Sequence, residues 1–290
     1  MNTLKQVVLA TPVNTPFYYE NIGKTAQWAL EQEVLLAPKP GLVDSHNTGS
    51  HSDLSVDLML LSAKTLSPYF TEMAADSSLL PSLTLIRHAI GQIGRDAEVE
   101  MMKATNNVNT HRGAIWALGL LSAAASQETG KITAVKLCRD AGEIAKIDDI
   151  NTPATFSKGK AACQKYKVNG AKQEAQLGFP SIVNLALPAL RNSRLNGDDE
   201  SAARLNALMA IMTELSDTCV LSRSGIEGLN YMQQQAQKVL NLGGAATTAG
   251  YQALLAFGIH MEALNASPGG AADLLAATLF VDELENQYIS

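Results

Sequence analysis

The sequence predicts an all-α fold, and three observations support this prediction. Ala, Leu, Met, Gln and Glu are abundant among the 290 residues, and these residue types favour helices. Apolar residues recur at three- and four-residue spacing, which is the period of a helix with one buried face. Alternating strand patterns are rare, and no strand–helix–strand unit carries a glycine-rich phosphate loop. We therefore expect a multi-helix globular bundle whose cleft is lined by the loops at helix junctions.

Each expected helix follows from a local pattern. The first has Ile22, Ala26 and Leu30 on one face, and Asp53 precedes the second as an N-cap. The third repeats apolar residues at helical spacing. The fourth is apolar nearly all round, so we place it at the centre, and the fifth is amphipathic. The expected helices are 22–36, 54–67, 82–103, 113–126, 131–146, 158–168, 180–194, 199–216, 225–241, 248–264 and 269–286.

The pattern indicates a single all-α domain over residues 21–290, preceded by an N-terminal extension of residues 1–20. A chain of this length can bury a large core. Residues 147–158 are the best candidate for a linker within it, and there is no internal repeat or low-complexity tract.

Composition argues against several classes of protein. The net charge of −6 disfavours a nucleic-acid surface, and no window approaches the roughly 18 apolar residues of a membrane span. Residues 1–20 lack the basic start and apolar core of a signal peptide. Cys138, Cys163 and Cys219 are unclustered, which is typical of a reduced cytoplasmic protein and argues against a zinc ribbon. We expect a cytoplasmic protein with neither a nucleic-acid nor a membrane partner.

Polar clusters recur at the junctions between the apolar helices, and we call them the five polar islands. A polar segment between apolar helices must lie at the surface or line a cleft. Glycines, small polar side chains and the free N–H groups of a helix start suit an anionic ligand. The alternative is that each island is a solvated loop or a helix cap. The islands are residues 38–53, 105–113, 170–180, 217–225 and 267–273.

The first island is the richest in chemistry. It contains Lys39, Asp44, His46, His51 and Asp53, together with prolines and glycines that forbid a regular helix. A cation, carboxylates and imidazoles together suit a phosphorylated ligand, often with a metal. The two histidines could ligate a metal, although zinc sites usually show tighter spacing. Carboxylates from separate helices around Mg²⁺ fit a phosphate-handling site better.

Other islands contain charged residues with specific expectations. Arg112 precedes the central helix and offers the fixed fork of donors that suits phosphate. Asp217 is expected at the C-terminus of the helix 199–216, where the dipole disfavours a carboxylate, so we interpret it as a ligand. Lys172 and Glu174 offer a phosphate contact and a metal or base carboxylate, or simply a solvated turn. Capping and turn chemistry alone explain the fifth island.

Together and in order, the islands resemble the triphosphoribosyl-dephospho-coenzyme A synthase family. The resemblance covers about 26–282, and five motifs in sequence are far more specific than any one of them. The details are closest to the branch that serves malonate decarboxylase, with the citrate lyase branch as the related paralogue. The matching residues are Glu33 with Pro38-Lys39-Pro40-Gly41-Leu42-Val43-Asp44, Gly49-Ser50-His51-Ser52-Asp53, Val108-Asn109-Thr110-His111-Arg112-Gly113, Glu174-Ala175 with Gly178-Phe179-Pro180, Asp217-Thr218, Arg223, and Ser267-Pro268-Gly269-Gly270-Ala271-Ala272-Asp273.

Two motifs depart from the family pattern. The usual Ala-Arg-Gly-Glu-Ala is Ala171-Lys172-Gln173-Glu174-Ala175 here, and the usual Arg-Gly-Gly is Arg223-Ser224-Gly225. Lys172 keeps the positive charge but loses bidentate phosphate recognition.

The resemblance implies an enzyme, a pentosyltransferase that joins ATP to 3′-dephospho-CoA. The ribose 2′-hydroxyl of dephospho-CoA would attack C1′ of the ATP ribose, adenine would leave, and the triphosphate would stay on the product. That product, 2′-(5″-triphosphoribosyl)-3′-dephospho-CoA, is the prosthetic-group precursor for the malonate decarboxylase acyl carrier protein, which is served through a separate transferase. Because this is a glycosyl transfer, the absence of a phosphate loop is expected.

Displacement at an anomeric carbon needs a carboxylate base, negative charge near the oxocarbenium-like carbon and a donor for adenine. The triphosphate needs cations and Mg²⁺. The expected catalytic residues are Asp44, Asp217, Glu174 and His111. The expected nucleotide-binding residues are Lys39, Asn109, Thr110, Arg112, Arg223, Gly269 and Gly270. The expected Mg²⁺ ligands are among Glu33, Asp44, Asp53, Asp217 and Asp273.

Two other functions stay open at this point. An all-α, Mg²⁺-dependent hydrolase of nucleotide or ADP-ribose bonds would share acids at helix junctions but would not need dephospho-CoA. A helical adaptor would leave the islands solvated and a contiguous apolar patch exposed. A homodimer is compatible with the sequence.

Overall fold

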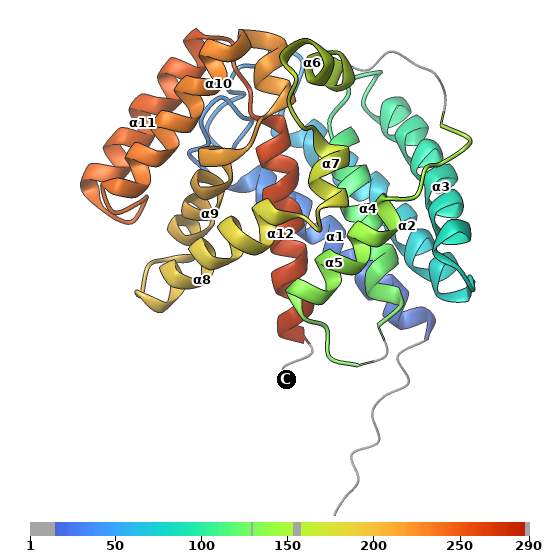
Figure 1. The fold of residues 1–290 in the computed structure, drawn as a ribbon. Helices are drawn as coiled ribbons and strands as arrows, with labels where there is room; N and C mark the ends of the chain where they lie inside the picture. Colours follow the sequence, from blue (N-terminus) through green and yellow to red (C-terminus); the bar gives the residue numbers. More distant parts are fainter. Residues whose placement is uncertain (1–14, 129, 153–157, 288–290) are drawn as a thin grey trace, which may run out of the picture.

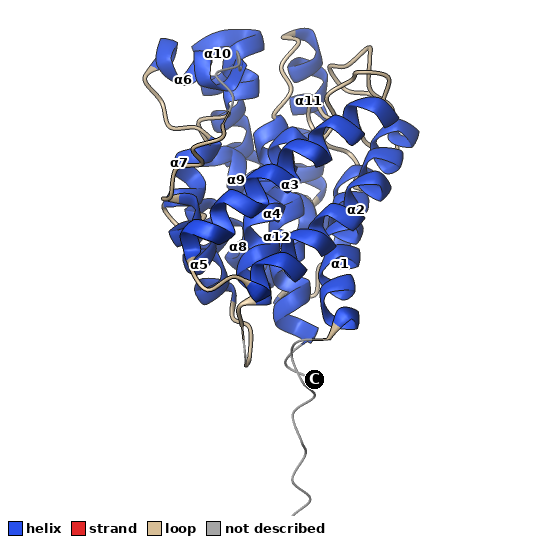
Figure 2. Cartoon of the chain, turned by 90° about the vertical axis from the view of Figure 1, so that its right-hand side faces the viewer, coloured by secondary structure: helices blue, strands red, loops and turns tan. Residues whose placement is uncertain are grey.

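The computed structural model describes residues 15–128, 130–152 and 158–287, and within these ranges it contains helices and loops but no strand (Figure 2). The all-α prediction is therefore confirmed. No described helix combines the length and the apolar character that a bilayer crossing requires. The helices are α1 (Pro16–Leu35), α2 (Val56–Leu79), α3 (Leu83–Ala104), α4 (Arg112–Ser126), α5 (Ala134–Ala145), α6 (Lys158–Tyr166), α7 (Ala171–Gln176), the π-helix η1 (Ser181–Ala186), α8 (Leu187–Leu195), α9 (Glu200–Glu214), α10 (Thr218–Asn241), α11 (Thr248–Ala263) and α12 (Gly269–Gln287).

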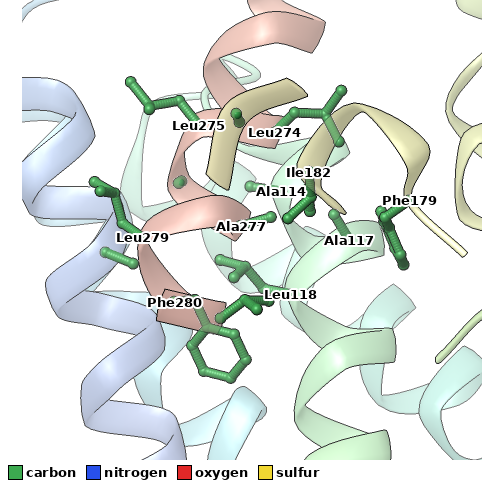
Figure 3. Packing of buried hydrophobic residues seen from close by; sticks show 14 of the residues in the cluster. Ala114, Ala117, Leu118, Phe179, Ile182, Leu274, Leu275, Ala277, Leu279 and Phe280 are labelled. Atoms are coloured by element: carbon green, nitrogen blue, oxygen red, sulfur yellow. The ribbon is translucent and has the colours of Figure 1, made fainter. Parts of the chain in front are cut away.

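The last helix, α12, runs through the middle of the molecule with other helices on both sides (Figure 1). It packs against α1 and α4 and also against α9 and η1. Figure 3 shows part of this contact, where Leu118 of α4 lies close to Phe280 of α12. Both side chains are fully buried, and one continuous cluster of buried apolar side chains includes residues from every α-helix.

The helix expected at the centre is α4, and it is buried almost completely. Its only residues that are not buried are Arg112, Gly113 and Trp116. All three lie in the first turn and a half, so this end of α4 is where the core opens toward the surface. The prediction of a central helix with an island at its start is confirmed.

The second helix is longer than expected and has a different cap. Pro68 lies inside α2, which continues to Leu79, although a proline commonly marks a helix boundary. The N-cap is Ser55, whose side chain accepts a hydrogen bond from the backbone of Leu58, and Asp53 lies outside the helix. The expected cap at Asp53 is therefore wrong, because Ser55 alone has its oxygen beside the free N–H groups.

The helix expected from residue 225 begins earlier, at Thr218. Gly225 interrupts it with φ of 68° and ψ of −163°, a conformation that glycine adopts without strain. Asp217 is the N-cap of this earlier piece, not the last residue of α9. The expectation that Asp217 opposes a helix dipole is wrong, because the dipole that it meets is that of the next helix.

Several expected boundaries fall at the edge of the described residues. α1 begins at Pro16, so residues 16–20 of the expected extension are helical, while residues 1–14 lie outside the described part. In the expected linker 147–158, residues 147–152 form a loop and residues 153–157 are not described.

Candidate active site

A cavity of about 300 Å³ opens where five helices begin, and we call it the acid cavity. Its wall includes Gly113 of α4, Ala171 of α7 and Ser181 of η1. Thr218 of α10 and Gly270 of α12 complete the set of helix starts. Four of the five polar islands therefore meet at one cavity, as the sequence predicts for a cleft built from junction loops.

The cavity wall carries four acids, Glu174, Glu214, Asp217 and Asp273. None of its described lining residues is a lysine or an arginine. The N-termini of the surrounding helices stabilise these acids instead, because the free N–H groups of a helix start attract negative charge. The cavity thus concentrates carboxylates in a place where backbone dipoles hold them.

Asp217 joins the starts of two helices. Its Oδ1 accepts hydrogen bonds from the backbone of Cys219 at 2.8 Å and of Val220 at 3.2 Å. Its Oδ2 accepts from the backbone of Ala271 at 2.9 Å, in the first turn of α12. Burial raises the pKa of Asp217, and the backbone donors oppose that rise. Asp217 is therefore a structural clamp at the cavity wall as well as a charge.

Asp273 reaches from α12 to the start of α4. Its carboxylate accepts a hydrogen bond from the backbone of Ala114. A Cβ atom on Gly113 would lie 1.9 Å from Oδ2 of Asp273, so only glycine permits this approach. Burial raises the pKa of Asp273 well above its ordinary value, and the nearby carboxylates of Glu33 and Asp217 raise it further.

Glu174 lies on the opposite wall, in the short helix α7. Its Oε1 accepts a hydrogen bond from the backbone of Ser181, the first residue of η1, at 2.8 Å. Burial raises the pKa of Glu174, and the hydrogen bonds from Ser181 lower it. A partly buried carboxylate with a raised pKa at a cavity wall has the properties of a general base.

Lys39 and Asp44 of the first island are buried but do not line the acid cavity. Nζ of Lys39 forms an ion pair with Glu33 at 2.5 Å and also bonds the backbone oxygen of Glu33. Asp44 accepts three backbone hydrogen bonds, from Lys39, His46 and Asn47, at 2.8 to 3.0 Å. Asp44 therefore fixes the fold of this loop, and Lys39 balances the buried Glu33 behind the cavity.

His111 lies behind the start of α4 in a buried chain of polar groups. Its Nδ1 is 2.8 Å from Oγ of Ser62, which is 2.6 Å from Oγ1 of Thr110. Burial, with a smaller effect of the Lys39 charge, lowers the pKa of His111 to about 3, so the ring is neutral. Asn109 caps α4, since its Oδ1 accepts from the backbone of Arg112 at 3.2 Å.

Arg223 connects loops outside the acid cavity. Its Nη2 donates to the backbone oxygen of Ser50 at 2.8 Å, and its Nη1 lies 3.3 Å from Nε2 of His51. Nε2 of His51 is also 2.7 Å from Oγ of Ser267. Asp53 is exposed, with Oδ1 3.5 Å from Nδ1 of His51. This network holds the first island against α10 and the fifth island.

Comparison with known proteins gives the family. The model of a family described as ATP:dephospho-CoA triphosphoribosyl transferase (CitG) matches residues 19–290. The chain belongs to this family. It is therefore an enzyme, a transferase, as the island motifs predict.

Curated relatives share the family and most of the chain. A protein of Klebsiella pneumoniae named 2-(5″-triphosphoribosyl)-3′-dephosphocoenzyme-A synthase is 51% identical over 91% of this chain and 94% of its own. Proteins with the same name marked as probable are 50% identical in Stutzerimonas stutzeri and 49% identical in Pseudomonas syringae pv. syringae. The match to the Stutzerimonas protein covers 93% of this chain and 93% of the relative, and the match to the Pseudomonas protein covers 92% of each. No solved structure matches the chain.

Within this member of the family, the structure gathers some of the expected residues and separates others. Glu174, Asp217, Gly270 and Asp273 line the acid cavity, and Glu33 lies close behind Asp273. The other expected residues do not line it. These are Lys39, Asp44, Asp53, Asn109, Thr110, His111, Arg112, Arg223 and Gly269.

A second cavity, also of about 300 Å³, adjoins the first and contains residues that the islands do not include. Arg87 and Arg95 of α3 and Arg112 of α4 line it, and we call it the arginine cavity. Trp116 belongs to the walls of both cavities. The sequence feature that could have indicated this cavity is the eight-residue spacing of Arg87 and Arg95 with Gly91 midway. This spacing places all three residues along one side of the helix.

Proposed function

We propose that this chain joins ATP to 3′-dephospho-CoA and gives 2′-(5″-triphosphoribosyl)-3′-dephospho-CoA plus adenine. The observation that supports this most directly is the acid cavity, where three carboxyl groups with raised pKa values surround a space at five helix starts. Negative charge is what a carbon with oxocarbenium character needs nearby. The name of the relatives describes the same product.

In the proposed reaction, Glu174 takes the proton of the ribose 2′-hydroxyl of dephospho-CoA. The hydroxyl oxygen then forms a bond to C1′ of the ATP ribose while the bond from C1′ to adenine breaks. Adenine leaves with the bonding electron pair and takes up one proton, which balances the proton that Glu174 removed. Asp217 and Asp273 supply negative charge to the cavity as positive charge develops on the sugar. Asn169 and Asn184 line the same cavity, and their amide groups can donate hydrogen bonds to the departing adenine.

Mg²⁺ fits the donor set of this cavity. No group of three metal-binding side chains is preassembled in the described residues. Mg²⁺ usually takes one or two carboxylates and completes its shell with water and phosphate oxygens. Asp273, with Glu33 beside it, is the pair that would hold the ion, since burial and the neighbouring carboxylates raise the pKa of Asp273 and a cation there would offset the second of these effects. When bound, Mg²⁺ would neutralise triphosphate charge.

The reaction is tested by incubating the protein with ATP and Mg²⁺, with and without 3′-dephospho-CoA. We expect adenine release only when both substrates are present, and a product whose mass equals the sum of the two substrates minus adenine. Adenine, ADP-ribose or phosphate released from a nucleotide alone would instead support the Mg²⁺-dependent hydrolase.

We also propose that the product serves malonate decarboxylase rather than citrate lyase, on the motif details of Thr110-His111-Arg112-Gly113 and Asp217-Thr218-Cys219. A separate transferase would then attach the product to the acyl carrier protein. Deleting the gene in its host should leave the malonate decarboxylase carrier protein without its prosthetic group, as read from the intact mass. Modification that persists would contradict this assignment. A homodimer stays a prediction.

A further inference from the structure

The arginine cavity has the charge and the position of a phosphate-binding site. Three arginines and two acids, Glu98 and Asp149, line it, so its described charged residues leave one net positive charge. The acid cavity next to it carries four acids and no basic residue in its described lining. Two adjacent cavities of opposite charge are what a substrate with an anionic tail and a reactive sugar would require.

The acids hold the arginines in place but leave some of their N–H donors unused. Nη1 of Arg95 donates to Oδ2 of Asp149 at 2.5 Å, and Nη2 donates to Gln92 at 3.0 Å. Arg112 forms an ion pair with Glu98 across the cavity mouth. A guanidinium has five N–H donors, so one bond to a carboxylate leaves others for a ligand.

Arg87 is the least satisfied of the three. It is 8% exposed, and its Nε has no hydrogen-bond partner among the residues that the structure describes. Its Nη1 lies 3.8 Å from Oδ2 of Asp149, which is a long ion pair. Its guanidinium lies 5.1 Å from the ring centroid of Trp116, which fixes it at the boundary with the acid cavity. A buried cation with an unused donor in a cavity favours the binding of an anion there.

The glycine on this face of α3 keeps space for the cluster. A Cβ atom on Gly91 would lie 2.3 Å from Oδ2 of Asp149 and 2.9 Å from Nη1 of Arg87. The cavity therefore depends on a glycine that lets a buried carboxylate and a guanidinium meet against the helix backbone.

The first turn of α4 connects the two cavities. Gly113 faces the acid cavity, Arg112 faces the arginine cavity, and Trp116 faces both. A nucleotide with its ribose beside Asp273 and its phosphates beside α3 would therefore contact Trp116.

We propose that Arg87, Arg95 and Arg112 bind the phosphate chain of a nucleotide substrate whose ribose occupies the acid cavity. This inference rests on the proposed function for the identity of the nucleotides, ATP or 3′-dephospho-CoA. Both have a phosphate chain attached to a 5′-carbon, and their common chemistry is what the guanidinium forks recognise.

Binding of single substrates tests the proposal without turnover. We would measure dissociation constants of ATP, 3′-dephospho-CoA and sodium tripolyphosphate, each with Mg²⁺, by calorimetry on the wild type and on Arg95→Gln and Arg112→Gln. Arg112 is half exposed, so Arg112→Gln should fold even if Arg95→Gln, which strips a partner from buried Asp149, does not. Arg139→Gln is the matched control, because Arg139 is an exposed arginine of α5 outside both cavities.

We expect each cavity variant to bind at least one of the nucleotides about tenfold more weakly, with Arg139→Gln within twofold of the wild type. Loss for ATP and tripolyphosphate assigns the cavity to the triphosphate, and loss for 3′-dephospho-CoA assigns it to the diphosphate of that substrate. Lower thermal stability with unchanged dissociation constants for all three ligands would overturn the proposal. If binding follows the expected pattern while the wild type forms no product, the proposed reaction fails and the phosphate site stands.

Discussion

The acid cavity and the arginine cavity share the first turn of α4 but have opposite chemistry. In the acid cavity, backbone N–H groups at helix starts hold Glu174, Asp217 and Asp273 in place. In the arginine cavity, side chains hold side chains, as Asp149 holds Arg95. Backbone donors stay rigid, whereas arginine side chains can exchange one acceptor for another. The first arrangement suits a reacting centre and the second suits a charge that arrives with a ligand.

The difference offers a protein of net charge −6 a way to bind the two polyanions of the proposed reaction. In the proposed reaction, the negative groups are concentrated where a carbon would become positive, and the cations are set apart where phosphate would lie. Experiments that change one cavity at a time should therefore separate catalysis from binding.

Glu174→Gln should have the largest effect. Without a base at α7, the turnover number should fall by about 100- to 10 000-fold, while the dissociation constants of both substrates change little. The measurement is adenine release under saturating substrates, with calorimetry for binding. The matched control is Gln176→Glu in the same short helix, which should stay active. A turnover number near the wild-type value would remove Glu174 from the mechanism.

Gly113→Ala should come next, because its new methyl group would displace the carboxylate of Asp273. We expect adenine release to fall by about tenfold or more, since misplacing a charged group by about 1 Å can cost up to 100-fold in rate. Gly258→Ala is the control, as its Cβ would meet only ordinary contact, 3.8 Å from Pro40. If both variants keep full activity, the approach of Asp273 to α4 is irrelevant to the reaction.

Asp44→Ala tests whether the first island is a support and not a reactant. Removing a buried acceptor of three backbone donors, one of which is itself buried, should lower the free energy of unfolding by about 1–2 kcal/mol. Asp53→Ala changes an exposed carboxylate of the same loop and should be nearly neutral. Chemical denaturation measures both. Turnover per folded molecule should survive Asp44→Ala, and its complete loss would return Asp44 to the catalytic set.

The smallest effect concerns pH and Asp273. Folding raises the pKa of this carboxyl, so its contribution to stability is fully present below the pKa of the unfolded chain, about 3.9, and is lost as pH rises through the folded pKa. Asp273→Asn cannot ionise, so the variant does not lose this stability at high pH. In buffer with EDTA at pH 8, the variant should melt about 2 °C higher than the wild type, a gain of about 1 kcal/mol. The gap should close near pH 4; a variant that is less stable at pH 8 would refute the assigned cause.

Much of the fold could be predicted because its signals are local. Helical spacing located α3 and α4, and the lack of charged residues in 113–126 predicted the burial of α4. The start of α10 was missed because Gly225 interrupts the helical pattern and hides the turn before it. Pro68 had the same effect on α2, where helix packing outweighs the local preference.

The candidate site was only partly predictable for a different reason. Asp217 and Asp273 belong to recognisable islands, but their hydrogen-bond donors are the backbone N–H groups of Ala271 and Ala114. Residue types do not identify such donors. Asp44 is an aspartate like Asp217 and Asp273, but its carboxylate accepts hydrogen bonds from the backbone of its own loop. Arg87 and Arg95 are ordinary residues of an amphipathic helix until α4 is packed beside them.

The shared wall at Trp116 also gives the protein an optical reporter. Its indole Nε1 donates to the backbone oxygen of Ala171 at 3.1 Å, and its ring faces Arg87. Trp28 is the only other tryptophan in the chain, and it lies beside Arg204. In a Trp28→Phe variant, all tryptophan fluorescence would come from Trp116, in the wall shared by the two cavities. Two substrates that contact this ring differently would give two separable changes in emission, and their order in a rapid-mixing trace would reveal which substrate binds first.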